Sequence, residues 1–123
     1  MVDVNLVTGS GWKSASVVIE VFPGFESTLR SDQIAPALVE QHVSLPSVPE
    51  GTAPTDELFP LLASTDVTAD YVFSPAELPV LAREAAGFSD LLTGKWRWQY
   101  AVLHDFAEWA LADSTVRLEF VGD

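Results

Sequence analysis

The sequence contains no cysteine and only six lysine and arginine residues, against eighteen aspartate and glutamate residues. The absence of cysteine excludes a disulfide framework, a thiolate nucleophile and a cysteine-ligated metal. No apolar run approaches the roughly 18 residues that a membrane-spanning helix needs. The first five residues also lack the basic start and the apolar stretch of a signal peptide. These absences predict a soluble cytoplasmic protein that does not interact with membranes.

The shortage of basic residues leaves the chain with a net charge of -12. A field of this sign repels nucleic acid and anionic lipid, and it attracts basic partners. The acidic residues are scattered along the chain and do not form a tail, so solubility or a salt-rich environment explains the charge equally well. If the charge has a binding role, the predicted partner is a basic protein and not nucleic acid.

The composition indicates one globular domain over residues 1–123, because hydrophobic residues make up 48% and charged residues 20%. One stretch, at about 43–60, differs from the rest because it contains four prolines (Pro46, Pro49, Pro54 and Pro60). This proline density excludes a long helix or a central strand and predicts a surface loop. A loop of this length is either functional or a stiff connector.

Three segments show the period-two alternation of half-buried strands. Their alternating apolar positions are Val2, Val4 and Leu6; Ala15, Val17, Ile19 and Val21; and Val116, Leu118 and Phe120. The first two segments are separated by residues 8–11, Thr-Gly-Ser-Gly, which are typical of a turn. The pattern therefore predicts an N-terminal hairpin, which the last segment can join as a C-terminal strand.

A helix is predicted after Ser74, because a serine cap, a proline at the first helical position and Glu77 three residues on form a capping box. Its apolar stripe is Leu78, Leu81, Ala82 and Ala85. Gly87 is predicted to stop the helix, and Arg83 and Glu84 are predicted to lie on its outer side.

A second long helix carries the stripe Leu103, Phe106, Ala107 and Ala110, which Trp96, Tyr100 and Trp109 are predicted to widen. The small, mostly antiparallel sheet, made of the N-terminal hairpin and the C-terminal strand, is then covered by two long helices. The predicted fold is an α+β two-layer sandwich.

The aromatic residues at the start of the second helix allow two interpretations. Trp96, Trp98 and Tyr100 alternate, and successive steps of two residues turn a helix by about 200°, so they cannot share one face. Either the helix begins near Gln99 or some of the rings point outward as a contact patch. We expect Trp98 to be the most exposed of the four tryptophans. The predicted partner-binding residues are Trp96, Trp98, Tyr100, Asp105 and Glu108.

No set of residues is typical of an active site. His104 and Glu108 lie four residues apart, a spacing that suits a metal ligand pair, a proton relay or a plain surface ion pair. The HExxH pattern is absent, and His42 is the only other histidine. We therefore predict no catalytic residue, no cofactor and no metal.

Three parts of the C-terminal region carry a resemblance: residues 73–78 (Phe-Ser-Pro-Ala-Glu-Leu) with Leu81 and Glu84, a later helix with Phe106 and Ala107, and the terminal residues 118–123 (Leu-Glu-Phe-Val-Gly-Asp). In these residues the chain resembles a group of small acidic bacterial proteins, mostly of unassigned function, some of which look like immunity proteins of polymorphic toxin systems. The resemblance covers roughly the last fifty residues and brings no catalytic residues with it.

Charge, size and this resemblance together predict a non-enzymatic, acidic protein-binding module, an immunity-type inhibitor of a basic toxin, acting as a monomer or homodimer. One alternative is a small enzyme or ligand-binding protein that uses the His104–Glu108 face, with the long loop as a lid. Another is a mimic of nucleic acid, if the carboxylates are spaced along one face.

Overall fold

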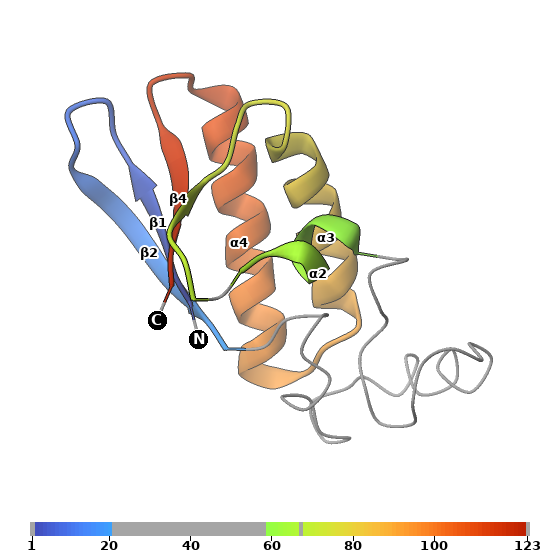
Figure 1. Cartoon of the computed structure of the whole chain (residues 1–123). Coiled ribbons are helices and arrows are strands. Elements are labelled where there is room, and N and C mark those ends of the chain that lie inside the picture. The colour runs from blue at the N-terminus through green and yellow to red at the C-terminus, as the bar shows by residue number, and fades with distance from the viewer. Residues whose placement is uncertain (1, 21–58, 67, 123) are drawn as a thin grey trace.

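The computed structural model describes residues 2–20, 59–66 and 68–122 (Figure 1). The predicted proline-rich loop lies outside the described residues, except for its last two positions. Four strands form one antiparallel sheet in the order β2-β1-β4-β3. They are β1 (Val2–Val7), β2 (Lys13–Ile19), β3 (Tyr71–Val72) and β4 (Arg117–Val121).

The predicted N-terminal hairpin is confirmed, with Val4 of β1 opposite Val17 of β2. Its turn needs the glycine at position 11, which has a φ of +89°, a backbone conformation that side chains with a Cβ disfavour. The N–H of Gly11 donates to the carbonyl of Thr8 at 2.9 Å, and this hydrogen bond closes the turn.

The predicted C-terminal strand, β4, pairs with β1 and places Leu118 and Phe120 in the core. β3 was not predicted from the sequence. It consists of only two residues, too few to show an alternation, and it exists because Tyr71 pairs with Phe120 on the outer side of β4.

Within the described ranges, three helices follow the hairpin: α2 (Pro60–Ser64), α3 (Leu78–Asp90) and α4 (Gly94–Ala112). Both long helices lie on the same face of the sheet, so the predicted α+β architecture is confirmed (Figure 1). α4 contacts β1, β2 and β4 directly, and α3 packs along α4. None of the helices in the described ranges is long and apolar enough to cross a membrane.

Aromatic rings connect the layers of the core. Phe88 of α3 meets Tyr100 of α4 edge to face, with ring centroids 4.7 Å apart, and it meets Phe59 in the same way at 5.1 Å. Phe73 contacts Phe120 of β4 edge to face at 4.7 Å. These pairs fix α3, α4 and the sheet in one packed unit.

Two predictions about α3 are wrong. The helix does not stop at Gly87 but continues to Asp90, and a Cβ at position 87 would lie 3.3 Å from the Phe59 ring. The glycine therefore allows close packing and does not end the helix. Glu84, predicted on the outer side, is only 3% exposed because α2 covers it.

The predicted capping box before α3 is formed. The N–H of Ser74 donates to Glu77 Oε1 at 2.9 Å, and the N–H of Glu77 lies 3.3 Å from Ser74 Oγ. The α-helix itself begins at Leu78, so the box closes a turn that leads into it.

Replacing Ser74 by alanine should lower the free energy of unfolding by about 1 kcal/mol, because the Glu77 N–H loses the Ser74 hydroxyl as an acceptor and keeps only the Ser74 carbonyl. Urea unfolding should show a lower midpoint with an unchanged slope. Ser114→Ala, in the exposed turn before β4, is the matched control and should leave the midpoint in place. Equal midpoints for the two variants would mean that the serine does not stabilise α3.

Candidate functional site

Helix α4 carries the residues predicted to bind a partner, and it begins at Gly94 and not near Gln99. The alternating rings therefore point in different directions, as the helix geometry requires. Trp98 is 62% exposed, Trp96 is half-buried and Tyr100 is fully buried. The interpretation in which the helix begins near Gln99 is therefore wrong. Of the three alternating rings, only that of Trp98 points outward into solvent.

Tyr100 is a core residue, and its prediction as a contact residue is wrong. Its ring packs against Phe88 between α4 and α3, and it has no exposed surface that a second protein could contact. Burial also raises the pKa of the Tyr100 hydroxyl well above its ordinary value. Trp96 packs against the same core, and its indole nitrogen is buried without a hydrogen-bond partner among the described residues.

The solvent-facing side of α4 carries a second exposed tryptophan that was predicted to widen the core stripe. Trp109 is 52% exposed, and it lies eleven residues after Trp98. At 100° per residue, that separation returns to within about 20° of the same direction. This spacing was visible in the sequence and could have identified the pair.

We call Trp98, Val102, Asp105 and Trp109 the tryptophan ridge. Their spacing of four, three and four residues places all four within about 60° around the helix axis. Trp98, Asp105 and Trp109 are exposed, and Val102 is half-buried against the core. The ridge is therefore an apolar line with one carboxylate in its middle.

Trp98 is nevertheless not the most exposed tryptophan. Trp12 is 76% exposed, because it lies at the end of the hairpin turn, where the chain has few neighbours.

Contacts on either side of α4 show which way the ridge faces. Gln99 Oε1 accepts the N–H of Glu20, which directly follows β2, at 3.1 Å, and Lys95 Nζ lies 3.1 Å from the Glu20 carboxylate. On the other side, Arg97 lies 3.7 Å from Asp90 of α3. The helix rotation places the ridge nearer to Gln99 than to Arg97, so it runs along the β2 side of α4.

His104 and Glu108 lie on the α3 side of the same surface. His104 Nε2 is 3.3 Å from Glu108, and His104 Nδ1 is 3.4 Å from Asp105. The predicted pair thus exists as a surface contact between His104 and Glu108, in which Glu108 turns away from the ridge. Within the described ranges, no group of three histidine, aspartate or glutamate side chains is arranged so that it could hold a metal ion.

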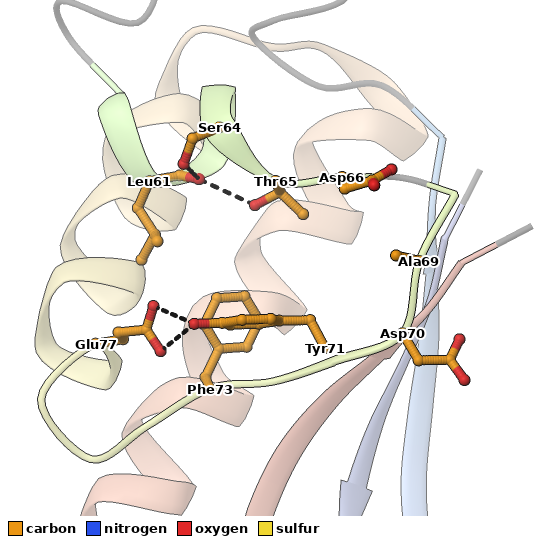
Figure 2. Close-up of a pocket in the computed structure, with 9 residues that line it drawn as sticks. All are labelled: Leu61, Ser64, Thr65, Asp66, Ala69, Asp70, Tyr71, Phe73 and Glu77. Carbon is orange, nitrogen blue, oxygen red and sulfur yellow. Dashed lines mark hydrogen bonds between the residues drawn. The ribbon is translucent and has the colours of Figure 1, made fainter.

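A pocket of about 230 Å³ lies on another part of the molecule, between α2, β3 and the start of α3 (Figure 2). The Tyr71 hydroxyl donates to both oxygens of Glu77, at 2.7 and 2.6 Å. Hydrogen bonds from the Ser74 backbone and from Tyr71 hold the pKa of Glu77 below its ordinary value, and the bond to Glu77 raises the pKa of Tyr71.

The acidic groups of this pocket do not converge on a common point. Figure 2 shows the Glu77 carboxylate turned toward Tyr71, while that of Asp70 points away from the cavity. Asp66 accepts the N–H and the hydroxyl of Thr68, which lowers its pKa. The pocket therefore offers no arrangement for acid–base work on a bound molecule.

A shallower groove of about 400 Å³ lies where the start of α3 meets the end of α4. Its walls are mainly apolar, and they include Val72, Leu78, Leu111 and Val116. Leu111, near the end of α4, is 42% exposed at this groove.

Comparison of the chain with protein-family models, with curated proteins and with solved structures finds no match. The function proposed next therefore rests on the surface of α4 and on the charge of the chain.

Proposed function

We propose that this protein is a non-catalytic, acidic binding module that masks a basic protein partner, as an immunity-type inhibitor masks a toxin. The observation that carries the proposal is the tryptophan ridge, in which Trp98 is 62% and Trp109 is 52% exposed on one side of a single helix. Large indole surfaces are costly to leave in water, and tryptophan is the residue most enriched among the strong contacts of protein interfaces.

The charge of the chain supports a basic partner. A net charge of -12 attracts a basic protein over long distances and speeds its association. Asp105 lies between the two indoles, and Glu108 follows one turn later on the neighbouring side, so the ridge itself is bordered by carboxylates. Electrostatic attraction then brings the partner in, and the indoles hold it.

The ridge is also held in a fixed position before any partner arrives. Ser89 of α3 donates its hydroxyl to the Arg97 carbonyl at 2.9 Å. Gln99, on the other side, binds the backbone after β2 at 3.1 Å. A surface fixed in advance loses less conformational entropy on binding, which favours tight association.

The His104–Glu108 alternative gains less support. His104 is engaged by two carboxylates on an open helix surface, and it lines neither of the pockets of about 230 and 400 Å³. An enzyme needs a place where a substrate is held against its catalytic group.

Capture of a partner from the source cells tests the proposal. The wild-type protein and Trp12→Ala should retain the same basic protein, whereas Trp98→Ala/Trp109→Ala should retain much less. We expect the double variant to bind at least about tenfold more weakly, chiefly through faster dissociation. Trp12→Ala is the matched control, because Trp12 is even more exposed but lies outside the ridge.

Binding kinetics at several salt concentrations test the role of charge. Association should slow as salt rises, because screening shortens the reach of the field to about 8 Å at physiological ionic strength. His104→Ala should change neither the association rate nor the dissociation rate. Retention of the partner by Trp98→Ala/Trp109→Ala, or an association rate that does not depend on the salt concentration, would contradict the proposal.

A further inference from the structure

The free edge of β2 is the surface feature that the tryptophan ridge leaves unexplained. β2 is the outermost strand of the described sheet, and no described strand pairs with its outer side. Edge strands are normally protected by lysine, proline, bulges or a covering element, since their free backbone groups invite another strand. Residues 14–19 contain no charge and no proline, and the register shift of the hairpin lies at its turn, at Leu6/Val7.

The hydrogen-bond alternation of an antiparallel sheet identifies the free backbone groups. The N–H of Phe73 donates to the Leu118 carbonyl, so the backbone groups of Leu118 point from β4 toward β3. Those of the next residue, Glu119, then point toward β1, where Asn5 is its partner. The backbone N–H and carbonyl of Asn5 therefore point toward β4.

The backbone N–H and carbonyl of its neighbour Val4 consequently point toward β2, where Val4 pairs with Val17. Ser16 and Val18, on either side of Val17, turn their N–H and carbonyl groups away from the sheet. Both side chains are exposed as well, Val18 by 38%. The middle of β2 therefore presents two open pairs of backbone groups.

The next outward N–H along this edge is that of Glu20, and it is already bound by Gln99 Oε1 of α4 at 3.1 Å. This contact shows that side chains of α4 reach the edge of β2. Trp98 directly precedes Gln99 and begins the ridge, so the free edge and the ridge border the same surface.

The lengths of the two features agree. A strand of six residues spans about 20 Å, and the eleven residue steps from Trp98 to Trp109 rise by about 16 Å along a helix. One extended segment on the β2 edge would therefore match the ridge in length and meet it at its Trp98 end, where the backbone after β2 contacts α4, with every second side chain turned toward α4.

We propose that an extended basic segment of the partner pairs with the outer edge of β2 and lays alternate side chains against the Trp98 end of the tryptophan ridge. The inference rests on the proposed function and specifies its mode of binding, the addition of a strand to a sheet. Arginine or lysine in the row facing α4 would meet the indole face of Trp98.

The net charge favours a basic partner over a second copy of this chain as the occupant of the β2 edge. Two copies joined edge to edge would bring two net charges of -12 together, whereas a basic segment is attracted to the same surface.

The probe for the test is a blocked synthetic peptide of about eight residues that alternates arginine and valine, a length typical of strands. NMR should show that the peptide shifts the indole signal of Trp98 and slows amide exchange at Ser16 and Val18. The same peptide with glutamate in place of arginine should do neither.

Ser16→Pro removes one outward N–H, and its matched control, Ser16→Ala, keeps it. We expect Ser16→Pro to bind the peptide at least about tenfold more weakly, with Ser16→Ala within about twofold of the wild type. If Ser16→Pro fails to fold, amide exchange in the wild-type protein still decides the question.

The outcomes separate this inference from the proposed function. A peptide that shifts the Trp98 signal but leaves Ser16 and Val18 exchanging freely overturns strand addition, as does the absence of peptide binding. The proposed function fails by a different result, when Trp98→Ala/Trp109→Ala still retains the cellular partner.

Discussion

Tyr100→Ala should lower the free energy of unfolding by about 3–5 kcal/mol, the usual cost of deleting a large aromatic side chain from a core. Tyr100 is fully buried, and its ring meets Phe88 edge to face at 4.7 Å. Since small domains are stable by only about 5–15 kcal/mol, the variant should be near the limit of folding. Urea unfolding followed by circular dichroism measures the loss.

Trp98→Ala, two residues earlier on the same helix, is the matched control. It removes a larger ring from an exposed position, so it should change stability by no more than about 0.5 kcal/mol. A stable Tyr100→Ala protein that only loses its partner would show that Tyr100 acts at the interface after all.

Alkaline pH gives a second measurement on the same residue. Because burial raises the pKa of Tyr100, the folded protein holds the phenolic proton more tightly than the unfolded chain does. The resulting stability is complete below the unfolded pKa of about 10 and is lost as pH rises through the folded pKa. Tyr100→Phe should therefore lose less stability than the wild type on passing about pH 10.

Glu84→Gln should lower the free energy of unfolding by about 2–3 kcal/mol, although only one atom of the carboxylate is changed. The Glu84 carboxylate is buried and accepts the N–H groups of Leu61 at 3.2 Å and Leu62 at 3.0 Å. Glutamine keeps one oxygen but turns an NH₂ group toward the second N–H, so one buried donor loses its acceptor.

Arg83→Gln is the control for this change, because Arg83 is the exposed neighbour of Glu84 on α3 and should tolerate glutamine. Amide exchange should show the effect locally, with faster exchange in α2 of Glu84→Gln than in the wild type. Unchanged exchange in α2 would mean that the carboxylate does not hold this helix on α3.

Local sequence patterns predicted most of the described fold. The alternation of Val2, Val4 and Leu6 predicted β1, and the same pattern predicted β2 and β4, because a strand with one buried face has a period of two. The Ser74–Glu77 capping box predicted the start of the α3 region, since its hydrogen bonds join residues three apart.

The candidate site was predicted only in part. Trp98 and Asp105 were assigned correctly to the exposed side of α4, and Glu108 lies one turn away. Tyr100, assigned both to the core stripe and to the contact residues, is buried, and Trp109, assigned to the core stripe, is exposed. An indole or a phenol in a mixed sequence suits a core and an interface equally well. Only the position of α3, against which Tyr100 packs, distinguishes them.

By itself, the sequence determined the periods of the strands and helices, the α+β class and the acidic charge, because each depends on neighbours in the chain. Tertiary structure alone decided the burial of Glu84 beneath α2, the pairing of β3 with β4 and the contact of Gln99 of α4 with the backbone at the end of β2. Each of these joins residues far apart in the sequence, and no local pattern states which distant segment will lie against a given face.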